Sequence, residues 1–249
     1  MPIIIKSEEE IATIREAGRI VAQVLQVLAE AVRPGLVRKE LDRIVRQEFA
    51  ARGAKPTFLG YQGYPASVCV SVNDEIVHGI PDDRALREGD IVSIDLGATY
   101  KGFVGDAAMT VGVGRLDAEA ERLLRVTERA LQKGVAAART GAPLGAVSHA
   151  IQMEAEGEGF SVVREYVGHG IGREMHEEPQ VPNFGPPDRG PILRKGMVLA
   201  IEPMVNAGDW RTKRHDDNWT VSTLDGKRSA HFEHTIAITD GEAQILTLP

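Results

Sequence analysis

Apolar residues recur with the period of a helix over the first thirty residues. Ser7 is a typical helix N-cap, and the three glutamates that follow it favour the positive end of a helix dipole. The Arg-Pro-Gly sequence at 33–35 predicts the end of this helix. The apolar positions at helical spacing are Ile11, Ile14, Ala17, Val21 and Val24.

The same order of elements is predicted twice along the chain. A second helix, from about residue 37 to 52, ends at Gly53. Strand-like runs follow at 66–72, 90–100 and 102–113. The order then begins again, with helices predicted at 119–138 and 146–156 and a helix-breaking RTGAPLG sequence between them.

Two short phrases are repeated at almost one offset. LREGDIVSID begins at Leu86 and LRKGMVLAIE at Leu193, 107 positions later. RPGLVRKEL begins at Arg33 and RTGAPLGAV at Arg139, 106 positions later. We interpret the chain as one domain, 1–249, with an internal repeat of about 7–113 and 116–240. Two copies of this length do not suit a solenoid, so we expect two halves of helices and antiparallel strands that face a shared site.

Each copy of the longer phrase ends in an acid, Asp95 or Glu202. In the first half, a hairpin that turns at a Lys-Gly pair is expected to bring Asp95 roughly opposite Asp106, with the side chains about 4.5–5.5 Å apart. Apolar neighbours predict a largely buried sheet, where two carboxylates need a shared proton or a cation. Ser93 and Gly97, on the face of Asp95, leave room for such a group.

Glu202 and Glu233 repeat this problem in the second half. Glu202 ends its strand, and Glu233 is predicted to lie within a later strand, in SAHFEHTIAIT, after an inserted turn-rich segment. If the halves face each other, four carboxylates converge, and four negative charges inside a sheet require metal. We predict two divalent ions, Mn, Fe or Co, with Zn as a further option. Pairing of the acids with Lys or Arg is disfavoured, because no basic residue lies on the predicted inner faces.

Three of the seven histidines are candidates for a chemical role. His169 lies between two glycines, which let other groups approach closely, and would make a fifth metal ligand. His78 and His176 are candidate proton donors or hydrogen-bond partners of a developing oxyanion. The others are His149 and His215, interpreted as structural or surface residues, and His231 and His234, which receive no role.

Composition excludes several classes of protein. Hydrophobic residues make up 43% and charged residues 26%, an ordinary globular balance. A net charge of -7 argues against non-specific nucleic-acid binding, and no apolar run approaches the roughly 20 residues of a membrane span. A single cysteine, Cys69, permits no intrachain disulfide and fits a reducing compartment. Because the N-terminus has no secretory signal pattern, we expect a cytoplasmic protein.

Five stretches together resemble the type I methionine aminopeptidases in their short bacterial form. They are GYQGYPASVCVSVNDEIVHGIP, DIVSIDLGATYKGFVGD, GHGIGREMHEEPQVPNFG, GMVLAIEPM and FEHTIAIT. The resemblance covers nearly the whole chain in the family's order and spacing. It implies an α+β pita-bread fold, with two pseudo-symmetric halves around an antiparallel sheet. It also implies removal of the initiator methionine from nascent proteins whose second residue is small.

The resemblance assigns a role to each candidate. A metal-bound hydroxide would attack the first peptide carbonyl, and Glu202 would move the proton. His78 would contact the scissile amide, and His176 would stabilise the tetrahedral intermediate. Asp106 and Glu233 would bridge the two ions. The implied metal ligands are Asp95, Asp106, His169, Glu202 and Glu233.

The resemblance also implies an apolar pocket for the methionine side chain, where thioether–aromatic contacts contribute about 0.3–1.5 kcal/mol each. Three positions depart from the commonest pattern: Phe58 where cysteine is often found, Gln62 in place of a histidine, and Met175 where an aromatic is common. They affect the pocket and leave every metal ligand in place. The implied substrate-binding residues are Phe58, Tyr61, Tyr64, Cys69, His78, Met175, His176 and Trp219.

Two other interpretations are open. An Xaa-Pro aminopeptidase or prolidase would share the fold but usually carries an extra N-terminal domain, whereas here the first repeat begins within about ten residues of the start. A non-catalytic binding protein on this fold typically loses ligands, and all five are present. The expected partners are nascent polypeptide N-termini and, by resemblance, the ribosome, with no membrane and no nucleic-acid substrate. A monomer is the family expectation.

Overall fold

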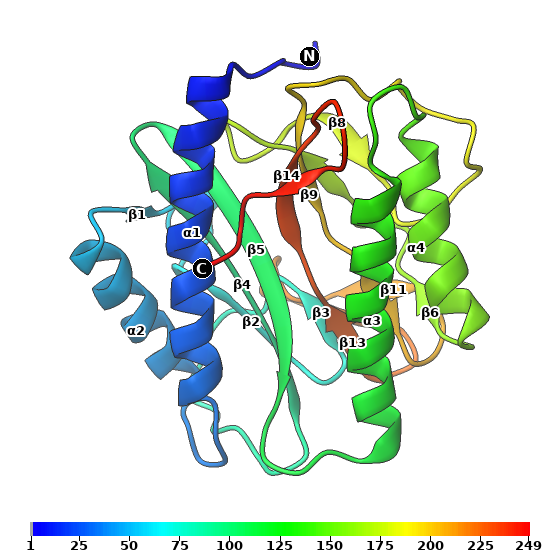
Figure 1. Ribbon diagram of the computed structural model, residues 1–249. Coiled ribbons are helices and arrows are strands. Elements are labelled where there is room, and N and C mark those ends of the chain that lie inside the picture. Colours follow the sequence, from blue (N-terminus) through cyan, green and yellow to red (C-terminus); the bar gives the residue numbers. More distant parts are fainter. Residues whose placement is uncertain (1) are drawn as a thin grey trace.

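Four long helices are arranged in two pairs in the computed structural model, which describes residues 2–249. Figure 1 shows the α1 and α2 pair on one side of the molecule and the α3 and α4 pair on the other. All four begin and end within a few residues of the predicted limits. The helices are α1 (Glu8–Ala31), α2 (Arg38–Ala51), α3 (Ala118–Ala137) and α4 (Gly145–Gly157).

A capping box begins α1. The backbone N–H of Glu10 donates to Ser7 Oγ at 3.2 Å, and the N–H of Ser7 donates to Glu10 Oε2 at 3.0 Å. Both bonds satisfy donors that have no partner inside the helix. The predicted N-cap is therefore confirmed. Ile14, Ala17 and Val21 are fully buried, so the predicted apolar stripe faces the core.

Two larger sheets follow the helices, one in each half. In the first sheet β4 pairs with β1 and β2 along one edge and with β5 along the other. Its strands are β1 (Lys55–Pro56), β2 (Cys69–Val72), β4 (Ile91–Tyr100) and β5 (Phe103–Gly112). In the second the order is β15-β14-β9-β7-β8. Its strands are β7 (Gly168–Gly170), β8 (Glu177–Val181), β9 (Val198–Ile201), β14 (His234–Ala237) and β15 (Gln244–Ile245).

The two halves share a pattern of two helices followed by an antiparallel strand pair, β4 with β5 and β9 with β14. The residues inserted between β9 and β14 form most of two three-stranded sheets, β13-β10-β6 and β11-β12-β3. These strands are β3 (Glu75–Val77), β6 (Ser161–Val162), β10 (Met204–Asn206), β11 (Thr212–Arg214), β12 (Val221–Thr223) and β13 (Ser229–His231). Each helix pair covers a separate hydrophobic cluster, and a third cluster, made of residues from both halves, joins the two halves.

The register of the β4–β5 hairpin differs from the expected one. Asp95 pairs with Ala108, and Asp106 pairs with Gly97, so the prediction that the two acids lie opposite each other is wrong. The two-residue turn between Tyr100 and Phe103 sets this register. The acids are two positions apart along the ladder, on one face of the sheet, and are diagonal neighbours.

A close backbone contact fixes α1 against β5. A Cβ added to Gly105 would lie 2.5 Å from the backbone nitrogen of Gly18. A Cβ added to Gly18 would lie 2.5 Å from the carbonyl oxygen of Leu246. Only glycine allows helix, strand and C-terminal segment to approach so closely, and the contact lies one residue from Asp106.

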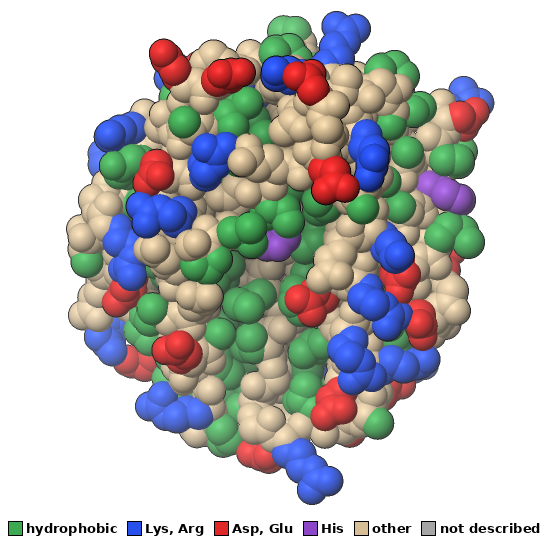
Figure 2. All heavy atoms as spheres, in the orientation of Figure 1, with side chains coloured by type: hydrophobic (Ala, Val, Ile, Leu, Met, Phe, Trp, Pro, Cys, Tyr) green, Lys and Arg blue, Asp and Glu red, His purple; other side chains and the backbone are tan. Residues whose placement is uncertain are grey.

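The outer face shows no segregation of charge. Basic and acidic side chains are interspersed across the face in Figure 2, while hydrophobic side chains gather along its middle, between the two helix pairs. Among the described residues, no helix is long and apolar enough to cross a bilayer.

Substituting Gly105 by alanine tests the α1–β5 contact. We expect Gly105→Ala to lower the free energy of unfolding by about 1–3 kcal/mol, because the added carbon overlaps backbone that cannot rotate away. Gly157→Ala is the matched control, since no atom lies within 4 Å of an added Cβ there. Urea unfolding of the metal-free proteins measures both. Equal midpoints for the two variants would show that the contact is not tight.

Candidate active site

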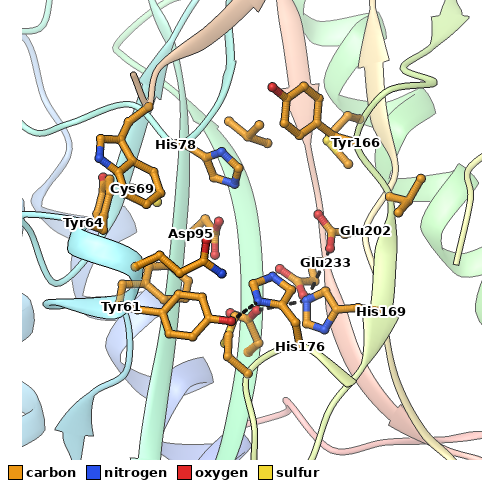
Figure 3. Close-up of a pocket in the computed structure, with 18 residues that line it drawn as sticks. Tyr61, Tyr64, Cys69, His78, Asp95, Tyr166, His169, His176, Glu202 and Glu233 are labelled. Carbon is orange, nitrogen blue, oxygen red and sulfur yellow. Dashed lines mark hydrogen bonds and ion pairs between the residues drawn. The ribbon is translucent and has the colours of Figure 1, made fainter. Parts of the chain in front are cut away.

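A pocket of about 320 Å³ is lined by residues from both halves of the chain. All thirteen residues singled out from the sequence line it, although they come from separate elements. Figure 3 shows Tyr64 and Cys69 on one wall, Glu202, Glu233 and His169 on the opposite wall, and His78 between Cys69 and Tyr166. The sequence motifs therefore meet in one place.

The four acids lie on or beside the central strands of the two halves. Asp95 and Asp106 point from β4 and β5, and Glu202 directly follows β9. Glu233 was expected within a strand, and this was wrong: it lies in the break between β13 and β14. The break lets β13 pair with β10 and β14 pair with β9, so the backbone changes sheets at the acid.

Hydrogen bonds across the seam between the halves bring Asp106 and Glu233 together. The N–H of Glu233 donates to the carbonyl of Ala108 at 2.9 Å. The Thr235 hydroxyl accepts from the N–H of Asp106 at 3.1 Å and donates to its carbonyl at 2.7 Å. On the other side of Glu233, the hydroxyl of a second threonine, Thr110, accepts from the backbone N–H of His231 and donates to its carbonyl. Threonine hydroxyls thus replace the ladder where the strands diverge.

His169 is oriented towards the acids. Its Nδ1 lies 2.9 Å from the carbonyl of Gly170 and donates to it, since a carbonyl can only accept. The other nitrogen, Nε2, lies 3.6 Å from Glu202 Oε1 and 3.9 Å from Asp106 Oδ2. Burial lowers the pKa of His169 to about 3, so the ring is neutral and Nε2 carries a free lone pair.

No Lys or Arg among the described residues forms an ion pair with any of the four acids, as predicted; the recorded partners are histidines. Burial raises the pKa of Asp106 to about 7, and burial together with the neighbouring acids raises the pKa values of Asp95, Glu202 and Glu233 well above the usual range. One oxygen each of Asp95, Asp106 and Glu233 is buried without a hydrogen-bond partner. Such a cluster is costly unless a cation neutralises it.

The donor set fits divalent metal ions. Asp106, His169 and Glu233 each offer one ligand atom, and these atoms lie within 4.8 Å of one another. Asp95 and Glu202 line the same pocket beside this group. Four carboxylates and one imidazole form an oxygen-rich set that suits Mn, Fe, Co or Zn. The unpartnered oxygens are the atoms that a bound ion would satisfy.

Two further histidines lie over the acids. The backbone at His78 has φ 60°, a left-handed conformation that is unusual for a residue with a side chain and that aims the ring into the pocket. Burial lowers the pKa of His78 to about 4. The hydroxyl of Tyr61 is hydrogen-bonded to His176 Nδ1 at 2.8 Å, and the His176 ring centre lies 4.3 Å from that of His169 (Figure 3). Burial also lowers the pKa of His176, so both rings favour the neutral form.

Aromatic side chains form the apolar wall. The Tyr64 ring packs edge-on to Trp219 and to Phe58, with ring centres 5.1 and 6.5 Å apart. Its hydroxyl donates to the carbonyl of Gly79 at 2.9 Å, which anchors the wall beside His78. Cys69, directly opposite Asp95 in the sheet, has a buried thiol whose pKa is raised, because burial and the nearby acids disfavour the thiolate. A nucleophilic role for this thiol is therefore disfavoured.

Sequence patterns alone gave no role to several lining residues. These are Val77, Tyr166, Val167 and Met204, whereas Gln62, already named as a departure that affects the pocket, lines it as well. Each lies within a few residues of a motif position, and this proximity is the one signal that could have found them. The sequence indicates no role for His231 either. It is buried, and its Nε2 lies 3.5 Å from Glu202 Oε2.

Comparison with protein families now decides the class of the chain. A model of metallopeptidase family M24 matches residues 12–240. The chain belongs to metallopeptidase family M24. The peptidase therefore uses a divalent metal cofactor, as the cluster of buried acids requires.

Similar curated proteins extend over the whole peptidase. Methionine aminopeptidase 1 of Bacillus subtilis is 54% identical over 245 residues, which are 98% of this chain and 99% of that protein. The methionine aminopeptidase of Clostridium perfringens is 53% identical over 246 residues, covering 99% of both chains. The predicted resemblance to that family is confirmed.

Solved structures confirm the predicted α+β pita-bread fold. A methionine aminopeptidase structure from Thermotoga maritima covers 100% of both chains with a TM-score of 0.98 and 49% identity. A prolidase from Pyrococcus furiosus shares the fold with a TM-score of 0.81, but it is 24% identical and the match covers only 66% of its chain. The roles of the individual site residues stay predictions, now with a common location.

The buried acids predict how pH changes the stability of the metal-free peptidase. Because burial raises the pKa of Asp106 from 3.8 to about 7, the folded chain holds a proton that the unfolded chain releases above about pH 4. Wild type should therefore lose stability relative to Asp106→Asn as pH rises from about 4 to about 7. The lowered pKa of His169 acts in the opposite direction, with stability lost as pH falls below 6.5, but it is common to both proteins.

Urea unfolding across this pH range, in chelator and then in Mn²⁺, measures the difference. In chelator we expect Asp106→Asn to be the more stable protein at pH 7. In Mn²⁺ the order should reverse, because wild type gains more binding free energy from an intact ligand set. If the difference in free energy of unfolding between wild type and Asp106→Asn stayed constant across the pH range, with and without Mn²⁺, Asp106 would be ionised and its charge balanced without metal.

Proposed function

We propose that this peptidase removes the N-terminal methionine from nascent proteins whose second residue is small. The observation that carries this proposal is that an aromatic, apolar wall lies directly beside the cluster of acids in one pocket. A methionine side chain against that wall has its own amide over the acids. The full-length similarity to methionine aminopeptidases from several bacteria supports the same activity.

Five side chains would hold two divalent ions. The first half of the chain would contribute Asp95 and Asp106. The second half would contribute Glu202 and Glu233, with His169 as the nitrogen ligand. Bound there, the ions would polarise the peptide carbonyl and lower the pKa of a water molecule.

Glu202 would move the proton. Its carboxylate lies between two imidazoles, 3.6 Å from His169 Nε2 and 3.5 Å from His231 Nε2. Without metal, burial raises its pKa well above the usual range. With the ions bound, it would take a proton from water and later release it to the leaving amine. Its backbone is held by Asn183, whose side-chain amide donates to the Glu202 carbonyl at 3.0 Å.

His78 and His176 would act on the peptide group. Both rings favour the neutral form, in which each has one N–H to donate. His176 would donate to the carbonyl oxygen as it gains negative charge, and the Tyr61 hydroxyl, hydrogen-bonded to Nδ1, would fix its ring. His78 lies on the other side of the pocket and would contact the scissile amide.

The apolar wall would select methionine. Tyr64, Trp219, Met175 and Cys69 line this wall, and aromatic rings and sulfur atoms are polarisable partners for an unbranched thioether. Phe58 closes one end, packed so tightly that a Cβ on Gly97 would lie 2.9 Å from its ring. We expect this bulky end to limit the length of side chain that enters.

The setting of the reaction follows from the substrate. We propose that the peptidase works in the cytoplasm as a monomer on nascent polypeptide N-termini, near the ribosome. A membrane and nucleic acid have no part in the reaction. An Xaa-Pro peptidase activity is less favoured, because the prolidase likeness extends to the fold alone and the pocket wall suits a long apolar side chain.

Peptide hydrolysis by metal-stripped protein tests the function. We would offer Met-Ala-Ser, Met-Lys-Ser and Ala-Pro-Ser, and add back Mn²⁺, Fe²⁺, Co²⁺ or Zn²⁺ without oxygen. Metal-dependent release of methionine from Met-Ala-Ser alone is the expected result, because the acids need a cation and the pocket needs a thioether.

The other substrates define the outcomes that contradict it. Cleavage of Ala-Pro-Ser in place of Met-Ala-Ser would keep the metal site and assign an Xaa-Pro peptidase. Bound metal with no hydrolysis of any peptide would leave a binding protein on this fold.

A further inference from the structure

Lys6 and Glu177 form a buried ion pair outside the pocket, at the end of the segment 172–177. Lys6 Nζ donates to Glu177 Oε2 at 2.6 Å, and the two side chains are 3% and 5% exposed. Lys6 precedes the first helix, and Glu177 begins β8, so the contact joins the N-terminal segment to the second half of the chain. Neither residue lines the pocket.

Lys6 is itself fixed in place. Its backbone N–H donates to the carbonyl of Gly196 at 2.8 Å, and its ammonium also donates to the carbonyl of Ile4 at 3.2 Å. Its stem packs on the segment, because a Cβ on Gly172 would lie 2.6 Å from Lys6 Cε. The ammonium is therefore a fixed point, in contrast to a typical surface lysine.

Glu177 links the Lys6 ammonium to the backbone of the segment 172–177. Its second oxygen, Oε1, accepts from the backbone N–H of Arg173 at 3.0 Å and from that of Glu174 at 3.3 Å. One carboxylate thus joins the ammonium on one side to two consecutive amides on the other. Among the described residues, Lys6 is the only cation that pairs with Glu177.

The segment between these bonds carries two pocket residues. Met175 and His176 follow the two tethered amides directly and precede Glu177, and both line the pocket. His176 reaches Tyr61 with one ring nitrogen, so a shift of the segment moves its other nitrogen relative to the acids. Met175 would move with it at the apolar wall.

We propose that Lys6 is a positioning residue, which through Glu177 holds the segment 172–177 so that Met175 and His176 face the substrate. This inference rests on the proposed function for its effect on activity, but the tether itself is independent of the substrate. Without the ammonium, the Glu177 carboxylate is a buried charge with no cation and turns towards water, releasing the two amides.

Three variants and one control test the proposal. Lys6→Met keeps the length of the side chain and removes its charge, and Lys6→Arg keeps the charge. Lys6→Met with Glu177→Met leaves no unpaired charge and no acceptor for the amides of Arg173 and Glu174, so this double variant lacks the tether without burying a charge. Lys195→Met is the control, since Lys195 forms an exposed pair with Asp240 at 2.7 Å and neither residue lines the pocket.

Hydrogen exchange of the segment measures the tether without any substrate. We expect the amides of Arg173 and Glu174 to exchange faster than in wild type in Lys6→Met and in the double variant. In Lys6→Arg and Lys195→Met these amides should exchange at the wild-type rate. Hydrolysis of Met-Ala-Ser measures the consequence. We expect kcat/KM to fall by about 10- to 100-fold in the two untethered proteins, with KM raised, and Mn²⁺ affinity within about twofold of wild type.

A purely structural role predicts a different pattern. If Lys6 only stabilised the fold, the folded fraction would keep the wild-type KM, and exchange would rise throughout the chain. That result, or a double variant with wild-type exchange and kcat/KM, overturns the proposal. A third outcome separates the tether from the proposed function. If wild type cleaves no methionyl peptide but the variants still show faster local exchange, the proposed function is contradicted and the tether is established.

Discussion

Four carboxylates buried together without a basic side chain are the constraint on which the structure depends. Each half of the chain supplies two of them, and no Lys or Arg among residues 2–249 pairs with any. The raised pKa values of these acids show that burial disfavours their ionised forms. A fold that keeps such a cluster does so because a cation is bound there in the working protein, and metallopeptidase chemistry follows from that cation.

The surrounding structure serves this cluster. Each half closes a hydrophobic core beneath its helix pair, and a third apolar cluster joins the two halves and forms part of the pocket wall. Thr235 and a second threonine replace the regular ladder at the seam, which brings Asp106 beside Glu233 while the strands diverge. Gly18 and Gly105 allow α1 to lie directly on the strand that carries Asp106.

Local pattern and the internal repeat predicted much of this. The helices, the repeated strand pair and the five candidate ligands could be found because periodicity and acid placement are local signals. The pairing of Asp95 with Asp106 was wrong, because the side-chain period fixes the face and only the turn fixes the register. Glu233 was placed within a strand, because the sequence does not show where a backbone changes sheets. Tyr166 and the Lys6–Glu177 pair depend on contacts between distant segments, which periodicity does not report.

The most direct test of the metal cluster is a crystal structure of the Mn²⁺-loaded protein with anomalous diffraction measured at the manganese edge. Two anomalous peaks are predicted between the halves, one beside Asp95 and one beside His169 and Glu202, with Asp106 and Glu233 beside both. A pocket without anomalous signal at saturating Mn²⁺, or with the acids held by protons or a basic side chain, would contradict the central claim that burial of these carboxylates requires divalent metal.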